Sequence, residues 1–386
     1  MKLYIPKPAV DTETIKLVIE LERLRNRRVS GSTPPWLFFE LKSLFHAIES
    51  IASARIEGNH TTVANFVEAV RDDEDQSTKQ TEQIREITNI EKGIDFIEKQ
   101  GSDLTINREL ILRLHQIVVD GLDPSKEGDT RAGAYRNEPR SISKSNISLA
   151  AWSDIPDLMD NLFDFINKAV DPQFDLLKDA VAHHYFTWIH PFGNGNGRVV
   201  RLLTYAMLTK QGFIDGDGMR LLSPAAVFGN DRNQYYGMLA EADKNTDPGI
   251  LKWCEYMLRG VKNEVDNVNE LLDASFTKGK IIVPALDYAL EKQRINELEY
   301  KMLKIAIEKD IVQAADFKPL FADEISHVNI SKAIRKLRQQ NFLRPLDGEK
   351  SRRYTIRLNR NALTLGVVMQ LDTQGYLPIQ DSQFSK

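Results

Sequence analysis

The sequence predicts a mainly α-helical protein that carries a small separate module near its C-terminus. Apolar residues recur at helical spacing through most of the chain, and no strand-rich block precedes residue 350. The last third combines three helical patterns with two short β-like pieces. These observations predict packed helices around a common core, followed by a helical module that ends in a hairpin.

Length and composition bound the class of protein. A chain of 386 residues with 42% hydrophobic residues can bury a sizeable core and fits two or three domains. The net charge of -4 points to no particular partner, and the single Cys254 excludes an intramolecular disulfide framework and a cysteine-rich metal site. Residues 1–10 lack a basic region followed by an apolar run, and no apolar stretch approaches the ~20 residues that span a bilayer. We therefore expect a cytoplasmic protein without membrane association.

The individual elements follow from apolar spacing and from breaking residues. The segment 31–35 and the pair Gly58-Asn59 interrupt the helical pattern, as does the polar stretch 72–79. Helices are expected at residues 12–29, 36–56, 61–71, 80–100, 107–119, 155–170, 174–189, 197–211, 233–243 and 248–274.

One long irregular segment separates these helices. Gly, Pro, Ser and Asn dominate residues 121–150, and an alternating stretch at 140–149 predicts a small hairpin around residues 143–146. Irregular chain of that length between helices often carries function.

The C-terminal third has a different character. Helical patterns at 297–309, 314–321 and 329–340 precede β-like pieces at 343–346 and 354–358. This order resembles a winged-helix module, a relative of helix-turn-helix. Residues 329–360 carry a local charge of +8, which would suit nucleic acid or simply form a solvated basic face. A winged helix can also serve as a protein-interaction module, so contact with either DNA or a protein is expected to be possible here. The candidate contacts are Lys332, Arg335, Lys336 and Arg338 on the last helix, with Lys350, Arg352 and Arg353 in the wing.

The stretch with the clearest chemistry is HPFGNGNGRVVR at residues 190–201. It reads as a glycine-rich loop between two helices, and the free N–H groups of the second helix would face the loop. That geometry favours phosphate, and Arg198 and Arg201, three residues apart, can add bidentate contacts. A Walker-type loop would end in Gly-Lys-Ser/Thr, and a dinucleotide fingerprint would follow a strand. Neither feature is present, so the loop predicts a phosphate site with His190 at its edge.

The same stretch resembles the motif of the Fic family, His-x-Phe-x-Asp/Glu-Gly-Asn-Gly/Lys-Arg-x-x-Arg. Every position matches except Asn194, which replaces the acidic residue. The resemblance implies a Fic-type helical core and transfer of AMP from ATP to a Ser, Thr or Tyr hydroxyl of a protein. It also implies site roles: His190 as general base, Gly195, Asn196 and Gly197 as the anion hole, Arg198 and Arg201 on the phosphates, and Asn194 at the Mg²⁺ position.

A second element of the family lies upstream. Residues 53–59, SARIEGN, resemble the inhibitory motif Ser/Thr-x-x-x-Glu-Gly/Asn. The resemblance implies that Ser53 and Glu57 lie on a helix against the nucleotide site and that Glu57 pairs with Arg201. Without the resemblance, Glu57 reads only as a solvated residue near a helix end.

Weaker parts of the resemblance assign further residues to the site. The hairpin at 140–149 resembles the family's flap, which would hold a target backbone by strand addition. Tyr235 and Tyr236 sit where relatives often place aromatic residues near adenine, although either could equally belong to the core. His183 and His184 are expected in the core or at the surface, because no further ligand completes a metal pair.

These expectations give a domain map and three competing functions. The map has an N-terminal helical region (1–104), the catalytic core (105–262), a connecting helix or linker (263–292), the winged-helix module (293–362) and a C-terminal tail (363–386). The main hypothesis is an autoinhibited protein adenylyltransferase that uses ATP and Mg²⁺. The alternatives are a DNA-binding regulator with an inactive or nucleotide-sensing Fic domain, and a phosphotransferase with another donor. The target protein stays open, the chain itself among the candidates, as does a homodimer.

Overall fold

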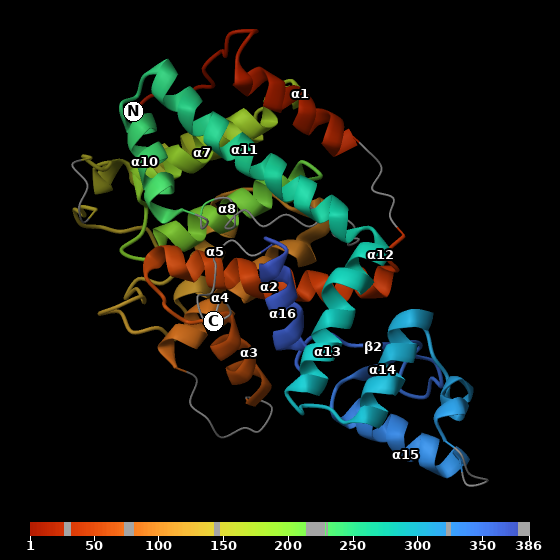
Figure 1. Ribbon diagram of the computed structural model, residues 1–386. Helices are drawn as coiled ribbons and strands as arrows, with labels where there is room; N and C mark the ends of the chain where they lie inside the picture. The colour runs from red at the N-terminus through yellow and green to blue at the C-terminus, as the bar shows by residue number, and fades with distance from the viewer. Residues whose placement is uncertain are drawn as a thin grey trace. The chain divides into compact units, whose positions relative to one another are not determined.

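Helices dominate the computed structural model, which confirms the mainly α fold class (Figure 1). It describes residues 1–26, 32–72, 81–142, 147–213, 228, 231–321 and 326–376. Packing divides the chain into two compact units. The first comprises residues 1–29, 46–61 and 80–268, and the second comprises residues 30–45, 62–79 and 269–386.

The first unit is built entirely from helices and loops in its described residues. Short 3₁₀ turns at Gly101–Asp103, Trp152–Asp154 and Pro172–Phe174 lead into or out of the longer helices. The helices are α1 (Glu13–Asn26), the second half of α2 (Pro35–Glu57), α4 (Glu82–Gln100), α5 (Arg108–Val119), α6 (Ile155–Asn167), α7 (Asp175–Ile189), α8 (Asn196–Lys210), α10 (Arg232–Asp243) and most of α11 (Asp247–Leu271).

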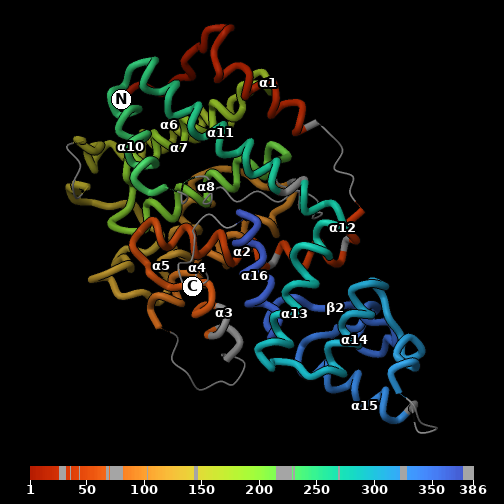
Figure 2. The backbone as a smooth tube through the Cα atoms, in the orientation of Figure 1, coloured from red at the N-terminus to blue at the C-terminus, as the bar shows by residue number. Residues whose placement is uncertain are grey.

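The centre of this unit is formed by α7 and α8, which run side by side (Figure 1). Nearly every residue of both helices is buried, so neither shows a polar face. The backbone trace in Figure 2 shows α4 and α5 beside α8, and all three helices contact one another. Burial on all sides fixes the two ends of the loop at residues 190–195, because its flanking helices cannot shift without disturbing the core.

The second unit combines helices with a two-stranded sheet. Strand β1 (Leu343–Pro345) pairs antiparallel with β2 (Tyr354–Ile356), with Arg344 opposite Thr355. The helical elements are the first part of α2, α3 (Val63–Asp72), α12 (Ala274–Phe276), a π-helical turn (Thr277–Ile282), α13 (Val283–Glu291), α14 (Glu297–Lys309), the 3₁₀ helix η6 (Ala314–Leu320), α15 (Ser326–Gln339) and α16 (Thr364–Thr373).

The structure departs from the sequence-based expectations in three places. Residues 363–386 were expected as a tail, but their first part forms α16, whose apolar side chains are buried and which packs on α13. The expected helix at 314–321 is a 3₁₀ helix, and Pro319 inside it lacks the N–H that an α-helical bond requires. Residues 140–142 and 147–149 carry no strand, and the turn at 143–146 lies outside the described residues.

Candidate active site

The loop between α7 and α8 begins and ends in left-handed backbone. His190 has a φ of 50° where α7 ends, and Gly195 has a φ of 75° where α8 begins. Glycine adopts the second conformation without steric cost, whereas the first needs support from its surroundings. The Asn196 side chain closes the loop, because it accepts a hydrogen bond from the Phe192 amide and donates one to the Phe192 carbonyl, both 2.9 Å long. Asn196 therefore shapes the loop with its side chain and leaves only its backbone for a ligand.

A buried histidine supports the loop from behind. The His115 ring stacks on Phe192 with 3.8 Å between ring centroids, and both side chains are fully buried. His115 Nδ1 accepts the amide of Gly133, so Nε2 carries the proton and donates to the Asn194 carbonyl at 3.2 Å. Burial lowers the pKa of His115 to about 4, which keeps the ring neutral. Nothing in the sequence singles out His115, because one histidine on the apolar face of a helix gives no signal.

His190 is poised to accept a proton. Its Nδ1 lies 3.4 Å from the Thr187 carbonyl, and a carbonyl only accepts, so Nδ1 holds the hydrogen and Nε2 the lone pair. Burial lowers the pKa of His190 to about 4, and the nearby Arg136 charge acts in the same direction. The imidazole is therefore neutral at physiological pH, the state that a general base requires.

Arg136 holds the strained backbone at His190 in place. Its guanidinium donates to the carbonyls of His190 at 2.8 Å, Ile189 at 3.3 Å, Glu138 at 2.9 Å and Ala150 at 2.7 Å. The side chain is 4% exposed, and burial lowers its pKa. One arginine thus ties the end of α7 to both flanks of the predicted flap segment, a role that residue spacing could not indicate.

Arg198 is engaged with two glutamates. Its guanidinium is fully buried and lies 3.0 Å from Glu127 Oε2 and 3.3 Å from Glu86 Oε1, with a further bond to the Glu127 carbonyl. Burial raises the pKa of both carboxyls, and the Arg198 charge opposes that shift. Arg198 and Arg201 therefore have different carboxylate partners, although they lie only three residues apart on α8.

Arg201 contacts the end of α2. Its Nε donates to Ser53 Oγ at 2.7 Å, and one terminal nitrogen donates to the Ser53 carbonyl at 2.9 Å and to Glu57 Oε1 at 2.7 Å. Burial opposes charge on Glu57, yet the charge and hydrogen bond of Arg201 bring its pKa below the usual range. The contact between Glu57 and Arg201 that the family resemblance implied is present in the structure.

The Glu57 carboxylate also lies against the first turn of α8. A Cβ atom on Gly197 would approach Glu57 Oε1 to 2.1 Å, so only glycine leaves room for the carboxylate there. The N-terminus of a helix carries free N–H groups and the positive end of the helix dipole. A negatively charged oxygen therefore already occupies the neighbourhood where that helix end favours an anion.

Both polar atoms of the Asn194 side-chain amide form hydrogen bonds. Its Nδ2 donates to the Lys126 carbonyl at 2.6 Å, and its Oδ1 accepts the amide of Gly195 at 2.7 Å. Its backbone amide donates to Asp129 Oδ2 at 3.0 Å. The described residues contain no group of three or more His, Cys, Asp or Glu that could hold a metal ion. At the acidic position of the motif, the Asn194 side chain is thus already engaged in contacts with the protein.

The two tyrosines expected near adenine differ in environment. Tyr235 is 2% exposed, and its hydroxyl lies 2.9 Å from His183 Nε2, which makes both residues part of the core. Tyr236 is 41% exposed and lies beside Arg232. His184 contacts Asp243 at 2.8 Å. Of the two tyrosines, only Tyr236 offers a ring face to a ligand.

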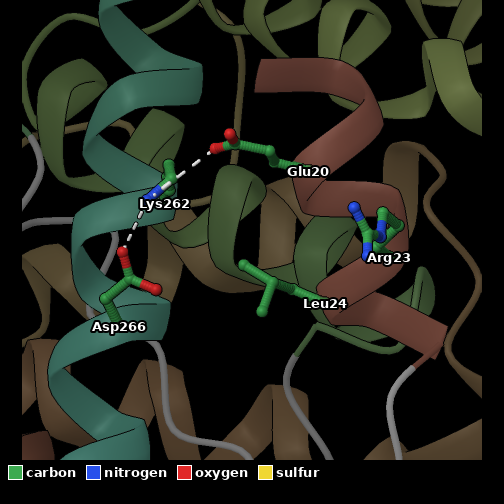
Figure 3. Close-up of a pocket in the computed structure, with 5 residues that line it drawn as sticks. All are labelled: Glu20, Arg23, Leu24, Lys262 and Asp266. Carbon is green, nitrogen blue, oxygen red and sulfur yellow. Dashed lines mark hydrogen bonds and ion pairs between the residues drawn. The ribbon is translucent and has the colours of Figure 1, made fainter. Parts of the chain in front are cut away.

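Two further hollows lie in the first unit. A cavity of about 490 Å³ between α1 and α11 is lined by Glu20, Arg23, Leu24, Lys262 and Asp266 (Figure 3). Lys262 forms ion pairs with the carboxylates of both Glu20 and Asp266. The charges that line this hollow are therefore already balanced. A second hollow of about 760 Å³ lies between α4, α5 and the following loop, and its charged lining mixes both signs.

Fold and site together define a mainly α-helical protein that sets a neutral histidine and a glycine-rich helix N-terminus at the two ends of one loop. Residues 105–208, which contain that loop, match the sequence profile of the Fic/DOC family. The chain therefore carries a domain of the Fic/DOC family.

Individual relatives support this assignment. The protein adenylyltransferase fic-1 of Caenorhabditis elegans is 26% identical over 149 residues, which is 38% of this chain and 26% of that protein. The protein adenylyltransferase Fic of Drosophila willistoni is 26% identical over 196 residues, 50% of this chain and 36% of that protein. The similarity thus spans about a third or less of these curated relatives.

Solved structures share the fold. A Fic family protein from Desulfovibrio desulfuricans G20 superposes with a TM-score of 0.54 at 19% identity, covering 92% of this chain and 98% of that one. Fic-1 of Caenorhabditis elegans gives 0.50 at 18% identity, covering 66% and 71%. The described residues contain no helix that is both long and apolar enough to cross a bilayer.

Proposed function

We propose that this protein transfers AMP from ATP to a Ser, Thr or Tyr hydroxyl of a protein. The observation that carries the proposal is the pairing of a neutral His190 with the N-terminus of α8, where the Glu57 carboxylate already takes an anion's place. The names of the related adenylyltransferases support the same chemistry. The target stays a prediction, with the chain itself among the candidates, as do the homodimer and the cytoplasmic location.

The reaction needs one base and a set of anion-stabilising donors. The target hydroxyl oxygen attacks the α-phosphorus of ATP while His190 Nε2 takes its proton. The bond between the α-phosphorus and the bridging oxygen breaks, and pyrophosphate leaves with the electron pair. Negative charge grows on the phosphoryl oxygens, and the backbone amides of Asn196 and Gly197 at the start of α8 would stabilise it. The amide of Gly195 donates to Asn194 Oδ1 and would have to leave that oxygen in order to contribute.

The two arginines take different parts in this proposal. Arg201 would orient the γ-phosphate once Glu57 has left it, and Tyr236 would lie near the adenine. Arg198 is held by Glu86 and Glu127, so we assign it to positioning the start of α8 instead of direct phosphate binding. This reassigns the role that the family resemblance had implied for Arg198.

The contact between Glu57 and Arg201 supports an autoinhibited state. While the carboxylate holds the guanidinium, ATP would bind with its γ-phosphate misplaced and its α-phosphate turned away from in-line attack. Ser53 adds two further contacts to Arg201 and so stabilises the position of Arg201 beside Glu57.

Mg²⁺ would enter as part of the nucleotide complex. Magnesium prefers hard oxygen ligands, usually carboxylates together with substrate phosphates and water. When bound, it would neutralise phosphate charge. The chain offers only the engaged amide of Asn194 at the motif's acidic position, so the phosphates themselves would hold the ion.

Labelled ATP tests the proposed function directly. The full chain is incubated with ATP labelled at the α position and, separately, at the γ position. Retention of the α label alone on protein is expected for AMP transfer. Retention of the γ label alone would establish a phosphotransferase, and absence of both labels even after Glu57→Gly would favour a regulator that only senses nucleotide.

A further inference from the structure

The C-terminal helices of the second unit form a small module with its own core. Helix α14 packs on η6 and β2, and α15 packs on η6 and β1. Val312, just after α14, pairs with Tyr354 at the start of β2, which adds a third short segment to the sheet. The hairpin between β1 and β2 is therefore anchored beside α15, a bridge that the sequence did not reveal.

Helix α15 is amphipathic, and its outer face is unusual. Ile330, Ile334 and Leu337 are at most 5% exposed and face the module's core. The opposite face repeats at helical spacing and exposes Val328, Lys332, Arg335 and Gln339. A helix of this length measures roughly 21 Å, which is ample to lie along a groove.

Part of the positive charge around this helix is already balanced. Lys336 lies 2.8 Å from Glu299, Arg338 lies 2.6 Å from Glu349, and Arg353 lies 3.6 Å from Asp347. These pairs remove three of the seven cations that the sequence singled out.

Four cations remain at the surface of the module. Lys332 and Arg335 lie on α15, and Lys350 and Arg352 lie in the turn between β1 and β2. All four are exposed, and none has an ion pair or hydrogen bond to the residues that the structure describes. Unbalanced cations at two separate elements of one module form a footprint suited to a polyanion.

We propose that this module binds double-stranded DNA, with α15 in the major groove and the β1–β2 turn on the phosphate backbone. The major groove of B-DNA admits an α-helix, whereas the deep, narrow groove of A-form RNA does not. Arg335 and Gln339 are side chains of the kinds that read guanine and adenine, and Val328 can contact a thymine methyl group. The proposal concerns the second unit and does not depend on the chemistry at His190.

Fluorescence anisotropy with a labelled random-sequence duplex of about 30 base pairs tests this function on the full chain. Affinity should fall steeply between 50 and 200 mM salt, because each neutralised phosphate releases counterions. The double variant Lys332→Ala/Arg335→Ala should bind on the order of tenfold more weakly.

A matched variant removes the same charge elsewhere. Lys301 and Lys304 are exposed on α14, and their double replacement by Ala should leave binding unchanged. Equal weakening by both pairs, absence of duplex binding at 50 mM salt, or tighter binding to single-stranded RNA would overturn the proposal. If the α15 variant fails to fold by circular dichroism, Lys350→Ala/Arg352→Ala asks the same question at the turn.

Discussion

The function proposed for this protein depends on the protonation and contacts of a few side chains around one loop. His115 is fully buried and His190 is half-buried, and desolvation lowers the pKa of both to about 4, but their surroundings separate their roles. His115 bonds the Asn194 carbonyl of the loop with one ring nitrogen and the Gly133 amide with the other, whereas His190 has one nitrogen on the Thr187 carbonyl. The hydrogen bonds thus distinguish His115, which supports the loop, from His190, which is the proposed base.

Replacing His190 should remove the base and leave the anion site. We expect His190→Ala to lower AMP transfer by about 10² to 10⁴-fold, with ATP affinity nearly unchanged. In the parent protein the rate should be flat across neutral pH and fall as the pH approaches 4, because protonation removes the lone pair. Radiolabel transfer and calorimetric ATP binding test this, and an unchanged rate in a folded variant would contradict the assignment.

Removing the carboxylate at Glu57 should free Arg201 for the γ-phosphate. We expect Glu57→Gly to raise AMP transfer by at least about tenfold, with no gain when Arg201→Ala is added. Glu57→Gln is the matched control, because it keeps the size and loses the charge; it should give a smaller gain. No gain in a variant that still binds ATP would reduce Glu57 to a residue at a helix end.

Asn194→Asp tests the missing acidic position. A carboxylate there should lower the Mg²⁺ concentration needed for transfer in the Glu57→Gly background. The same change loses the bond from Nδ2 to the Lys126 carbonyl, so we expect a stability cost of about 1 kcal/mol. Magnesium titrations and thermal melts measure both effects. Absence of transfer at any magnesium concentration, with the fold intact, would favour the binding-protein hypothesis.

At the scale of elements, the end of α2 is joined to α4 and, through it, to α8. The Asn59 side chain donates to Glu86 Oε2 at 2.8 Å and to the Gln83 carbonyl at 2.9 Å, and Glu86 in turn pairs with Arg198. The segment that carries Glu57 is therefore linked to both arginines of the loop. This linkage explains how a helix outside the catalytic core can hold a stable position against it.

Asn59→Ala should loosen that position without touching the catalytic loop. The buried carboxyl of Glu86 loses a donor, so we expect a loss of about 1–3 kcal/mol in the free energy of unfolding. AMP transfer should rise, but less than in Glu57→Gly, because the inhibitory carboxylate is still present. Chemical denaturation and label transfer test this; a stability loss with no rise in transfer would show that the linkage does not hold Glu57.

At the scale of the whole molecule, the first unit buries ionisable groups far from the loop. Asp179 is fully buried on α7, its Oδ1 accepts a hydrogen bond from Gln211, and burial raises its pKa to about 8. The folded protein therefore keeps this carboxyl protonated at neutral pH, whereas the unfolded chain ionises it. Between about pH 4 and 8 the folded state binds the extra proton, so this group lowers stability as the pH rises.

Asp179→Asn should remove that dependence. The variant should be more stable than the parent by about 5 kcal/mol at pH 8, and the difference should vanish towards pH 4. Urea unfolding at pH 5 and pH 8 measures the gap. The exposed Asp171→Asn serves as the control and should show no widening gap. A gap that stays constant with pH would contradict the raised pKa.

Local sequence determined much of this protein. Apolar periodicity gave the helical fold class and the main helices, because each buried helix needs an apolar face regardless of its neighbours. The motif at 190–201 indicated the Fic/DOC domain, because the residues of a phosphate-binding loop are consecutive in the sequence. The order of helices and strands between residues 297 and 358 was also predicted correctly, apart from the 3₁₀ form of η6, whereas helix α16 beyond them was not predicted.

Other features were decided only by tertiary structure. The sequence could place Arg198 and Arg201 on adjacent turns, but not which carboxylates would meet them, because Glu86, Glu127 and Glu57 lie far away along the chain. For the same reason it missed the support that His115 and Arg136 give to the loop. Helix propensity and motifs depend on residues that are neighbours in the sequence. The partner of a buried charge depends on packing between distant segments. Such a partner is required, because an unpaired charge in the core would cost several kcal/mol.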